Sequence, residues 1–360
     1  MEINELLTSC VKLEASDLHI SPNLPPLLRI HGDLQPLPGT EPLDPQMTKK
    51  LLYDIMSPDQ QAAFVTDLEL DFGVLIPDVA GFRVNAFRQI YGVAGVFRVI
   101  PSKIPTLDEL NLPPVFKSLL ELSNGLILVT GPTGSGKSTT LAAMVDYINM
   151  NQECHIITIE DPIEFIHQSK KSLINQRQIH RDTHDFTAAL RSALRQDPDV
   201  ILLGEMRDLE TIRLALTAAE TGHLVMGTLH TSSAPRTISR IVDVFPAGEK
   251  NIIRNLLSES IQGVICQTLL KNMTGGRIAA LEIMLGTPAI RNLIREDKIA
   301  QMQTAIQTGG ESGMMTLDQN LQQLVINQYI SPETAREAAS NKELFQLKDV
   351  QFETEVNNTL

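Results

Sequence analysis

Short apolar stretches alternate with turn residues over the first hundred positions of the chain. This spacing is typical of several strands in a small mixed α/β domain. Two short helices are expected between the strands, and Ser57 followed by Pro58 supplies a favourable N-cap and first helical residue for one of them. The pattern predicts strands over residues 18–20, 27–30, 72–76, 82–87 and 93–100, and helices over 47–56 and 58–64.

The pattern changes at Asn124, where apolar runs begin to alternate with helical segments. Such alternation predicts a parallel sheet that helices cover on both faces. In the first of these helices Leu141, Val145 and Ile148 fall on one face, as an amphipathic helix requires. The expected strands cover residues 126–129, 156–159, 200–203 and 224–226, and the expected helices cover 139–149, 185–195, 208–221 and 235–242.

Beyond Pro246 the sequence indicates helices alone, over residues 250–270, 288–295, 315–327 and 332–340. Prolines punctuate the stretch between the two patterns, which also holds an expected helix over 115–122. We therefore predict two domains joined by a linker, with a polar and acidic tail that is expected to be frayed and flexible. The predicted boundaries are 1–100 for the first domain, 101–123 for the linker, 124–345 for the second domain and 346–360 for the tail.

The size of the chain agrees with two domains, because 360 residues exceed what one hydrophobic core usually organises. A hydrophobic fraction of 42% and a charged fraction of 20% are typical of a folded globular protein. No apolar run approaches the ~20 residues that cross a bilayer, and Glu2 and Glu5 stand where a signal peptide needs basic residues. We therefore expect a cytoplasmic protein.

The formal net charge of -13 argues against two classes of function. Nonspecific binding to nucleic acid or to anionic lipid needs a basic surface, so we expect neither kind of binding to be the main activity. The three cysteines, Cys10, Cys154 and Cys266, show neither the pairing of a disulfide framework nor the spacing of a zinc site. They are expected to be buried or inert thiols.

Residues 131–138 read Gly-Pro-Thr-Gly-Ser-Gly-Lys-Ser and stand between an expected strand and an expected helix, which is the context of a P-loop. Backbone N–H groups would surround phosphates at the helix N-terminus, Lys137 would neutralise the β/γ oxygens, and the Ser138 hydroxyl would ligate Mg²⁺. A plain glycine-rich turn would leave Lys137 and Ser138 unexplained. The predicted nucleotide-binding residues are Gly131, Pro132, Thr133, Gly134, Ser135, Gly136, Lys137, Ser138 and Thr139.

Carboxylates follow two further strands of the second domain. Glu205 comes after the third strand, at the edge where α/β sheets place ligands, and Gly204 stands where an ordinary Walker B sequence has an aspartate. Glu205 is therefore the candidate base that polarises the attacking water. Glu160 and Glu164, after the second strand, would add oxygen ligands around Mg²⁺ and water. The alternative is that these acids lie at helix N-termini, where the helix dipole favours them.

Histidines and arginines supply further candidates. His223 and His230 bracket the fourth strand, and an imidazole at its carboxyl end could bond the γ-phosphate and report hydrolysis. A structural histidine is an equally common explanation. Arg83, Arg88 and Arg98 lie on strands of the first domain and could supply the positive charge that phosphoryl transfer needs, whereas solvated surface arginines are the alternative.

Together these motifs resemble those of the secretion-type ATPases that power type II secretion and type IV pili, over nearly the whole chain. Within that family the chain is most similar to the pilus retraction ATPases, because residues 289–296 resemble a stretch characteristic of retraction rather than extension motors. The chain also begins directly at the small domain and lacks the four-cysteine insertion usual in extension and secretion ATPases. The other segments that carry the resemblance are 15–19, 159–164, 194–199, 204–208 and 222–231.

This resemblance implies an α/β protein with a PAS-like N-terminal domain and a RecA-like ATPase domain whose sheet is mainly parallel. It also implies a hexameric ring that holds ATP between the two domains. The implied roles are Walker A for Gly131 through Ser138, acidic box for Glu160 and Glu164 with Glu160 near Mg²⁺, catalytic glutamate for Glu205, histidine box for His223 and His230, and phosphate contacts for Arg83 and Arg98.

Residues 289–296 also carry a helical pattern, in which Ile290, Leu293 and Ile294 form an apolar stripe with Arg291 and Arg295 beside it. One interpretation is a helix that packs on the ATPase core and leaves its arginines solvated. The resemblance favours a helix that transmits the nucleotide state to a partner, with both arginines dispensable for folding. The expected coupling set is Ala289, Ile290, Arg291, Asn292, Leu293, Ile294, Arg295 and Glu296.

The resemblance thus predicts a motor of pilus retraction that hydrolyses ATP and couples domain closure to an inner-membrane platform protein. The expected partners are further copies of the chain, the platform protein and, as a further candidate, the accessory retraction ATPase. Nucleic acid is not expected as a partner, and membrane association is expected only peripherally, through partners. The alternatives are the accessory retraction paralogue, a pilus extension or type II secretion ATPase, a non-catalytic ring subunit and a RecA-like DNA motor.

Overall fold

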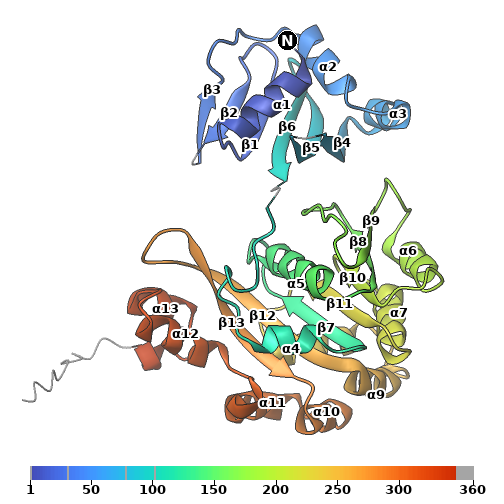
Figure 1. Cartoon of the computed structure of the whole chain (residues 1–360), viewed down its shortest axis with the longest axis vertical. Helices are drawn as coiled ribbons and strands as arrows, with labels where there is room; N and C mark the ends of the chain where they lie inside the picture. The colour runs from blue at the N-terminus through green and yellow to red at the C-terminus, as the bar shows by residue number, and fades with distance from the viewer. Residues whose placement is uncertain (1, 31, 78, 101–102, 346–360) are drawn as a thin grey trace, which may run out of the picture. The chain divides into compact units, whose positions relative to one another are not determined.

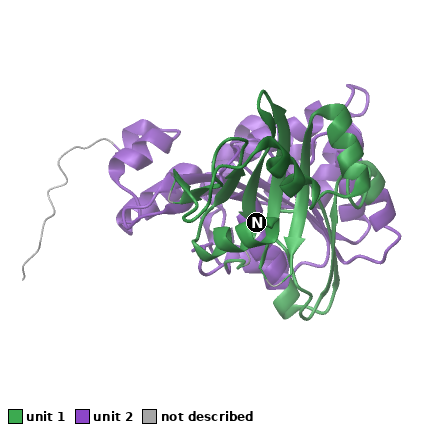
Figure 2. Ribbon diagram, turned by 90° about the horizontal axis from the view of Figure 1, so that it is seen from above, with its two compact units in different colours: residues 1–105, 149–189 green, residues 106–148, 190–360 purple. Residues whose placement is uncertain are grey.

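The computed structural model describes residues 2–30, 32–77, 79–100 and 103–345. The chain divides into two compact units (Figure 2). The first unit contains Met1–Pro105 and Asn149–Ala189, and the second contains Thr106–Ile148 and Leu190–Leu360. The predicted tail over 346–360 and positions 101–102 of the predicted linker lie outside the described residues.

A six-stranded sheet in the first unit has the order β3-β2-β1-β6-β5-β4, and its neighbouring strands are antiparallel. Its core includes the fully buried Leu7, Leu18, Phe82 and Phe97. The sequence pattern missed α1 and β3. The elements are α1 (Ile3–Lys12), β1 (Asp17–Ile20), β2 (Leu27–Ile30), β3 (Asp33–Pro36), α2 (Pro45–Tyr53), α3 (Pro58–Asp67), β4 (Glu69–Ile76), β5 (Ala80–Gln89) and β6 (Gly92–Ile100).

The predicted start of α3 is confirmed. Ser57 is its N-cap, and the Ser57 hydroxyl accepts from the Gln60 N–H while the Gln60 side chain accepts from the Ser57 N–H. This reciprocal capping satisfies two backbone donors that the first turn of a helix would otherwise leave unpaired. Local chemistry therefore decides this boundary.

A seven-stranded sheet has the order β13-β12-β7-β11-β10-β8-β9 (Figure 1). The β12-β7, β7-β11, β11-β10 and β8-β9 pairs are parallel, whereas β13 is antiparallel to β12. Every residue of β7 and β11 is buried, as expected for central strands that are covered on both faces. The predicted α/β class with a mainly parallel sheet is confirmed. The strands are β7 (Gly125–Thr130), β8 (His155–Glu160), β9 (Leu173–Gln178), β10 (Val200–Leu203), β11 (Leu224–Leu229), β12 (Ile261–Lys271) and β13 (Arg277–Leu285).

The helix predicted over residues 250–270 is wrong in its second half. It ends at Ser260, and β12 follows at once and pairs with the central strand β7. A short apolar run fits a buried strand and a buried helix equally well, so periodicity alone could not separate them. The helices are α4 (Val115–Leu120), α5 (Lys137–Asn151), α6 (Phe186–Ala193), α7 (Leu209–Glu220), α8 (Ala234–Asp243), α9 (Lys250–Ser260), α10 (Pro288–Arg295), α11 (Met302–Thr308), α12 (Leu317–Ile326) and α13 (Pro332–Ala338), with 3₁₀ turns at Ile299–Gln301, Gly310–Ser312 and Lys342–Phe345.

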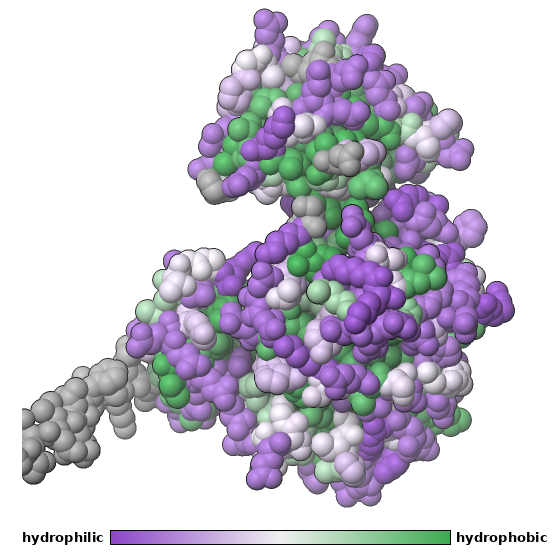
Figure 3. Space-filling model, viewed as in Figure 1, coloured by the Kyte–Doolittle hydropathy of each residue, from purple (hydrophilic) through white to green (hydrophobic). Residues whose placement is uncertain are grey.

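Hydrophilic side chains predominate on the face that Figure 3 shows, and apolar side chains lie between them in smaller patches. Among the described residues, no helix has both the length and the apolar character needed to pass through a bilayer.

Candidate active site

The predicted P-loop connects the end of β7 to the first residue of α5, Lys137. Gly131 and Gly136 have φ angles of 142° and 87°, in the region that only glycine adopts readily. A Cβ atom on Gly131 would lie 2.1 Å from the carbonyl oxygen of Gln267, and one on Gly136 would lie 2.8 Å from its Nε2 atom. The loop therefore requires glycine both for its conformation and for its close approach to β12.

Gln267 of β12 holds this loop by two hydrogen bonds. Its Nε2 donates to the Ser135 carbonyl oxygen over 2.8 Å, and its Oε1 accepts from the Thr140 hydroxyl over 2.8 Å. The sequence pattern does not reveal Gln267, because the apolar run that contains it also fits a helix. Only the pairing of β12 with β7 places Gln267 beside the P-loop.

The loop carries two polar groups that suit an anion. The Lys137 ammonium is buried and donates to the carbonyl oxygens of Gly131 and Pro132 over 2.9 and 3.0 Å. The buried Ser135 hydroxyl has no hydrogen-bond partner within the described part of the chain. Both groups lie at the amino end of α5, where the helix dipole favours negative charge. The loop therefore fits the phosphates of a nucleotide.

Ser138, the second residue of α5, is the candidate magnesium ligand on this helix. The described residues hold no group of three or more His, Cys, Asp and Glu side chains that could bind a metal by themselves. Mg²⁺ in nucleotide sites usually takes only one or two protein ligands and completes its shell with phosphate and water. The donor set is thus compatible with a metal that arrives with a nucleotide.

A cavity of about 420 Å³ lies next to the P-loop and was not foreseen from the sequence. Gly136, Thr139 and Thr140 contribute to its lining, and so do Asn272 and Arg277 of the β12–β13 hairpin. Asn272 and Arg277 add polar groups and Leu112 and Leu269 add apolar surface to this cavity, a combination that is typical of ligand pockets. The hairpin reaches this site because β12 pairs with β7, which the helix predicted over residues 250–270 did not allow for.

Glu205 and His230 meet because they follow the neighbouring parallel strands β10 and β11. The His230 Nε2 atom lies 3.2 Å from Glu205 Oε1, and the Arg207 Nε atom lies 2.6 Å from the same oxygen. Burial raises the pKa of Glu205, but the hydrogen bond and charge of Arg207, together with His230, bring that pKa below its ordinary value. Glu205 is thus an ionised carboxylate, 19% exposed, held between two nitrogen donors.

This pair lies next to the P-loop. The Gly131 N–H donates over 3.3 Å to the carbonyl oxygen of Leu229, the residue before His230. The structure therefore brings together the phosphate loop, His230 and Glu205 at the carboxyl edge of one sheet, where α/β proteins bind their ligands.

His223 is at the other end of the same strand. Its Nδ1 atom lies 3.0 Å from the Ala218 carbonyl oxygen, and its own carbonyl oxygen accepts from the Gly125 N–H. The six residues of β11 separate it from His230, a length of roughly 20 Å. Within this chain the structure does not bring His223 to Glu205.

Glu160 ends β8, as predicted, and its side chain is held by its neighbours. Its Oε1 accepts from the Thr158 hydroxyl over 2.6 Å and from Gln176 Nε2 over 3.2 Å. Burial raises the pKa of Glu160, and these hydrogen bonds offset part of that increase. Glu164 is exposed. Their roles as acidic-box residues and as a magnesium ligand stay predictions.

Arg83 and Arg98 face each other across β5 and β6. Both side chains are exposed, and each faces a carboxylate of its own sheet: the Arg98 Nε atom is 2.9 Å from Asp17 and the Arg83 Nε atom is 3.9 Å from Asp71. The predicted phosphate contacts would require each arginine to leave that carboxylate.

The predicted coupling segment, residues 289–296, covers most of α10 and its C-cap Glu296, and its two arginines make different contacts. The Arg291 guanidinium donates to the carbonyl oxygens of Gly286 and Ser258 over 2.7 and 2.6 Å, to that of Glu259, and to the Gln262 side chain over 3.0 Å. It therefore ties α10 to the end of α9, contrary to the expectation that it is dispensable for folding.

The remainder of α10 divides between core and surface. Ile290 and Ile294 are fully buried, so the apolar stripe packs on the core. Ala289, Asn292 and Arg295 are exposed, and Arg295 pairs with Glu259 over 2.8 Å. These residues form the exposed face of α10.

A glycine loop at the start of a helix, a buried lysine and a carboxylate–histidine pair at the carboxyl edge of a mainly parallel sheet define a P-loop nucleoside triphosphatase. The family model described as "Type II/IV secretion system protein" matches residues 1–342. The chain belongs to this family, and it is an ATPase.

Three comparisons refine this assignment. The chain is 61% identical to the type IV pilus retraction ATPase PilT of Pseudomonas aeruginosa, over 96% of this chain and 100% of that protein. It is 40% identical to the type IV pilus ATPase PilU of the same organism, over 93% and 88%. A crystal structure of the pilus retraction motor PilT with bound ADP superposes with a TM-score of 0.90 at 46% identity, over 96% and 98%. The predicted resemblance to pilus retraction ATPases is confirmed.

Proposed function

We propose that this chain is the principal ATP-driven motor of type IV pilus retraction and of the twitching motility that follows from it. It would act as a homo-hexamer on an inner-membrane platform protein, peripherally at the cytoplasmic face of the inner membrane, with the accessory retraction ATPase as a candidate partner. The observation that carries the proposal is the Glu205–His230 pair beside an intact P-loop, in a chain 61% identical to PilT.

In the proposed mechanism, the P-loop N–H groups and Ser135 bind the phosphates, and Lys137 exchanges its loop carbonyl partners for phosphate oxygens. Ser138 would hold Mg²⁺, with Glu160 as a further ligand; the metal would neutralise charge on the β- and γ-phosphates. Glu205 orients the attacking water and takes its proton. His230, hydrogen-bonded to Glu205, senses whether the γ-phosphate is present.

The first domain would supply arginines to the nucleotide site. We assign residues 1–100 to a PAS-like domain and 124–345 to a RecA-like domain, with closure between them bringing positive charge to the transferring phosphate. Arg83 and Arg98 would supply this charge after release from Asp71 and Asp17. Glu164 keeps its proposed role in the acidic box, and His223 keeps its proposed role in the histidine box. For His223, other copies of the chain in the ring would have to supply the remaining groups.

The exposed face of α10 is the proposed coupling surface. Asn292, Arg295 and Glu296 are available there, whereas Arg291 has a structural role. The accessory motor is the second candidate function, but identity to PilU is 40% against 61% to PilT. The net charge of -13 also disfavours a DNA motor.

Two variants test the hydrolytic assignment. Glu205→Gln should retain ATP binding and ring assembly but slow turnover by about a hundredfold or more, the scale of general-base loss. Lys137→Ala should weaken ATP binding itself. Steady-state ATPase assays with equilibrium binding of a fluorescent ATP analogue separate the two effects. Near-normal turnover of Glu205→Gln would reassign the base, and unchanged affinity of Lys137→Ala would contradict the P-loop assignment.

A motility test addresses the cellular role. In a bacterium with type IV pili whose own retraction motor is deleted, the wild-type chain should restore twitching and Glu205→Gln should not. Restored pilus assembly in a strain that lacks its extension motor would instead indicate an extension motor. Restored twitching only in a strain that lacks its accessory retraction ATPase would indicate the paralogue.

A further inference from the structure

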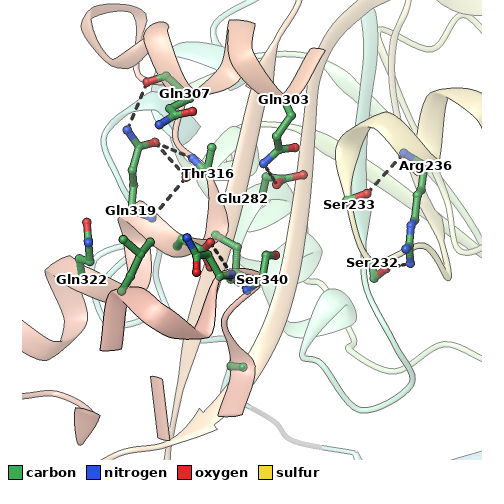
Figure 4. Close-up of a pocket in the computed structure, with 15 residues that line it drawn as sticks. Ser232, Ser233, Arg236, Glu282, Gln303, Gln307, Thr316, Gln319, Gln322 and Ser340 are labelled. Atoms are coloured by element: carbon green, nitrogen blue, oxygen red, sulfur yellow. Dashed lines mark hydrogen bonds between the residues drawn. The ribbon is translucent and has the colours of Figure 1, made fainter. Parts of the chain in front are cut away.

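Glu282 is a buried carboxylate outside the machinery described above. It lies in β13, is 5% exposed, and forms part of the wall of a cavity of about 880 Å³ (Figure 4). The other lining residues come mainly from the start of α8, from α11 and from α12. A carboxylate in such a position is costly unless hydrogen bonds compensate for its lost hydration.

The principal compensating bond comes from α8. The Ala234 N–H donates to Glu282 Oε1 over 2.7 Å, and Ala234 is the first residue of that helix. First-turn N–H groups have no acceptor within their own helix, and negative charge is favourable at a helix N-terminus. Ala234 follows His230 by only four residues. Glu282 therefore holds the start of α8, where the loop after His230 ends, together with the N-cap Ser233.

Glu282 is also connected to the P-loop, through the neighbouring strand β12. Cys266 on β12 is its direct neighbour in the antiparallel β12–β13 pair. The Thr130 hydroxyl donates to the Cys266 sulfur over 3.0 Å, and Thr130 immediately precedes Gly131. The strand that carries Glu282 is thus held in register with the residue from which the phosphate loop begins.

A third contact leads away from the nucleotide site. Gln303 Nε2 of α11 donates to Glu282 Oε2 over 3.4 Å, and Figure 4 shows the two side chains pointing toward each other. Glu282 consequently joins three elements: the start of α8, the central sheet and a helix of the C-terminal part.

We propose that Glu282 is a positioning residue that anchors the first turn of α8 and thereby orients His230 toward Glu205. Without this anchor the Ala234 N–H would be a buried donor without an acceptor, and the loop over residues 231–233 would shift to find one. The inference rests on the proposed role of the Glu205–His230 pair in ATP hydrolysis.

Three variants of the full-length protein separate geometry from charge. Glu282→Gln keeps an oxygen that can accept from the Ala234 N–H, and the Gln303 amide can rotate to match the new side chain. Glu282→Asp keeps the charge but is one methylene shorter, and Glu282→Ala removes both. Gln322→Ala is the matched control, because Gln322 lines the same cavity on α12 and is exposed.

The kcat of Glu282→Gln should be within about threefold of the wild-type value. The kcat of Glu282→Asp and of Glu282→Ala should be lower by about tenfold or more, because one lost buried hydrogen bond has an effect of this size. KM and the affinity for a nonhydrolysable ATP analogue should stay within about threefold, because the P-loop is retained. A double-mutant cycle with His230→Ala should be strongly non-additive.

A protein-level readout keeps this test independent of activity. Amide hydrogen exchange over residues 231–237 should accelerate in Glu282→Ala and Glu282→Asp, but not in Glu282→Gln or Gln322→Ala. If the wild-type protein hydrolyses no ATP but the variants show this exchange pattern, the proposed function is refuted and the anchoring of α8 by Glu282 is not. Wild-type kcat in Glu282→Asp and Glu282→Ala, equal loss of kcat and ATP affinity, or an additive cycle with His230→Ala would overturn the positioning role.

Discussion

Arg291 allows a sharp test, because its partners are known and its neighbour Arg295 is a natural control. Both arginines are on α10, one turn apart, and the sequence pattern places both beside the same apolar stripe. Arg291 donates to carbonyl oxygens at the C-terminal end of α9, whereas Arg295 forms one exposed ion pair with Glu259. Replacing each by alanine should therefore have very different effects on the local fold.

The magnitude follows from these contacts. Arg291→Ala removes a cation from the end of α9 and leaves the Ser258 and Gly286 carbonyl oxygens without this donor. A hydrogen bond to a charged group contributes about 1.5–3 kcal/mol, and a cation at a helix C-terminus about 0.3–1 kcal/mol. Because the side chain is only half-buried and water can replace part of the loss, we expect about 3 kcal/mol in total. Arg295→Ala should cost at most about 1 kcal/mol, as an exposed ion pair does.

Amide hydrogen exchange by mass spectrometry measures this difference locally, which suits a chain with two units that need not unfold together. In Arg291→Ala the protected amides of α9 and α10 should exchange about a hundredfold faster, since each tenfold corresponds to about 1.4 kcal/mol. Arg295→Ala should exchange within about fivefold of the wild type. Equal protection in the two variants would show that Arg291 does not hold α10 to the end of α9. So would wild-type protection in Arg291→Ala.

Two further predictions concern titration. Arg207 and His230 hold the pKa of Glu205 below its ordinary value, so the ionised base persists down to low pH and activity is lost only as the pH falls through that depressed pKa. Arg207→Gln should therefore move the acidic limb of the kcat profile to higher pH, and an unmoved limb would show that Arg207 does not set this pKa. Burial raises the pKa of Cys10 to about 11 and that of Cys266 to about 12, so neither thiol forms a thiolate at pH 8. Iodoacetamide should alkylate both only after denaturation, as peptide mass mapping can show; native labelling of Cys266 would contradict its burial.

The sequence by itself determined the features whose chemistry is local. The P-loop glycines, Lys137 and Ser138 are consecutive, so their order alone specifies a phosphate loop. The start of α3 at Ser57 is equally local. Glu205 and His230 could also be anticipated together, because residues that follow neighbouring parallel strands share one edge of the sheet.

The tertiary structure decided everything that depends on which segments pair. Residues 261–271 are apolar enough for helix or strand, and pairing with β7 makes them a strand and brings Gln267 to the P-loop. Arg291 and Arg295 have the same chemistry and almost the same place in the sequence. One becomes a clamp and the other stays at the surface because the carbonyl oxygens of α9 lie within reach of only one of them. A side chain's role depends on the groups that packing places around it, and these come from segments too distant along the chain for a sequence pattern to reveal.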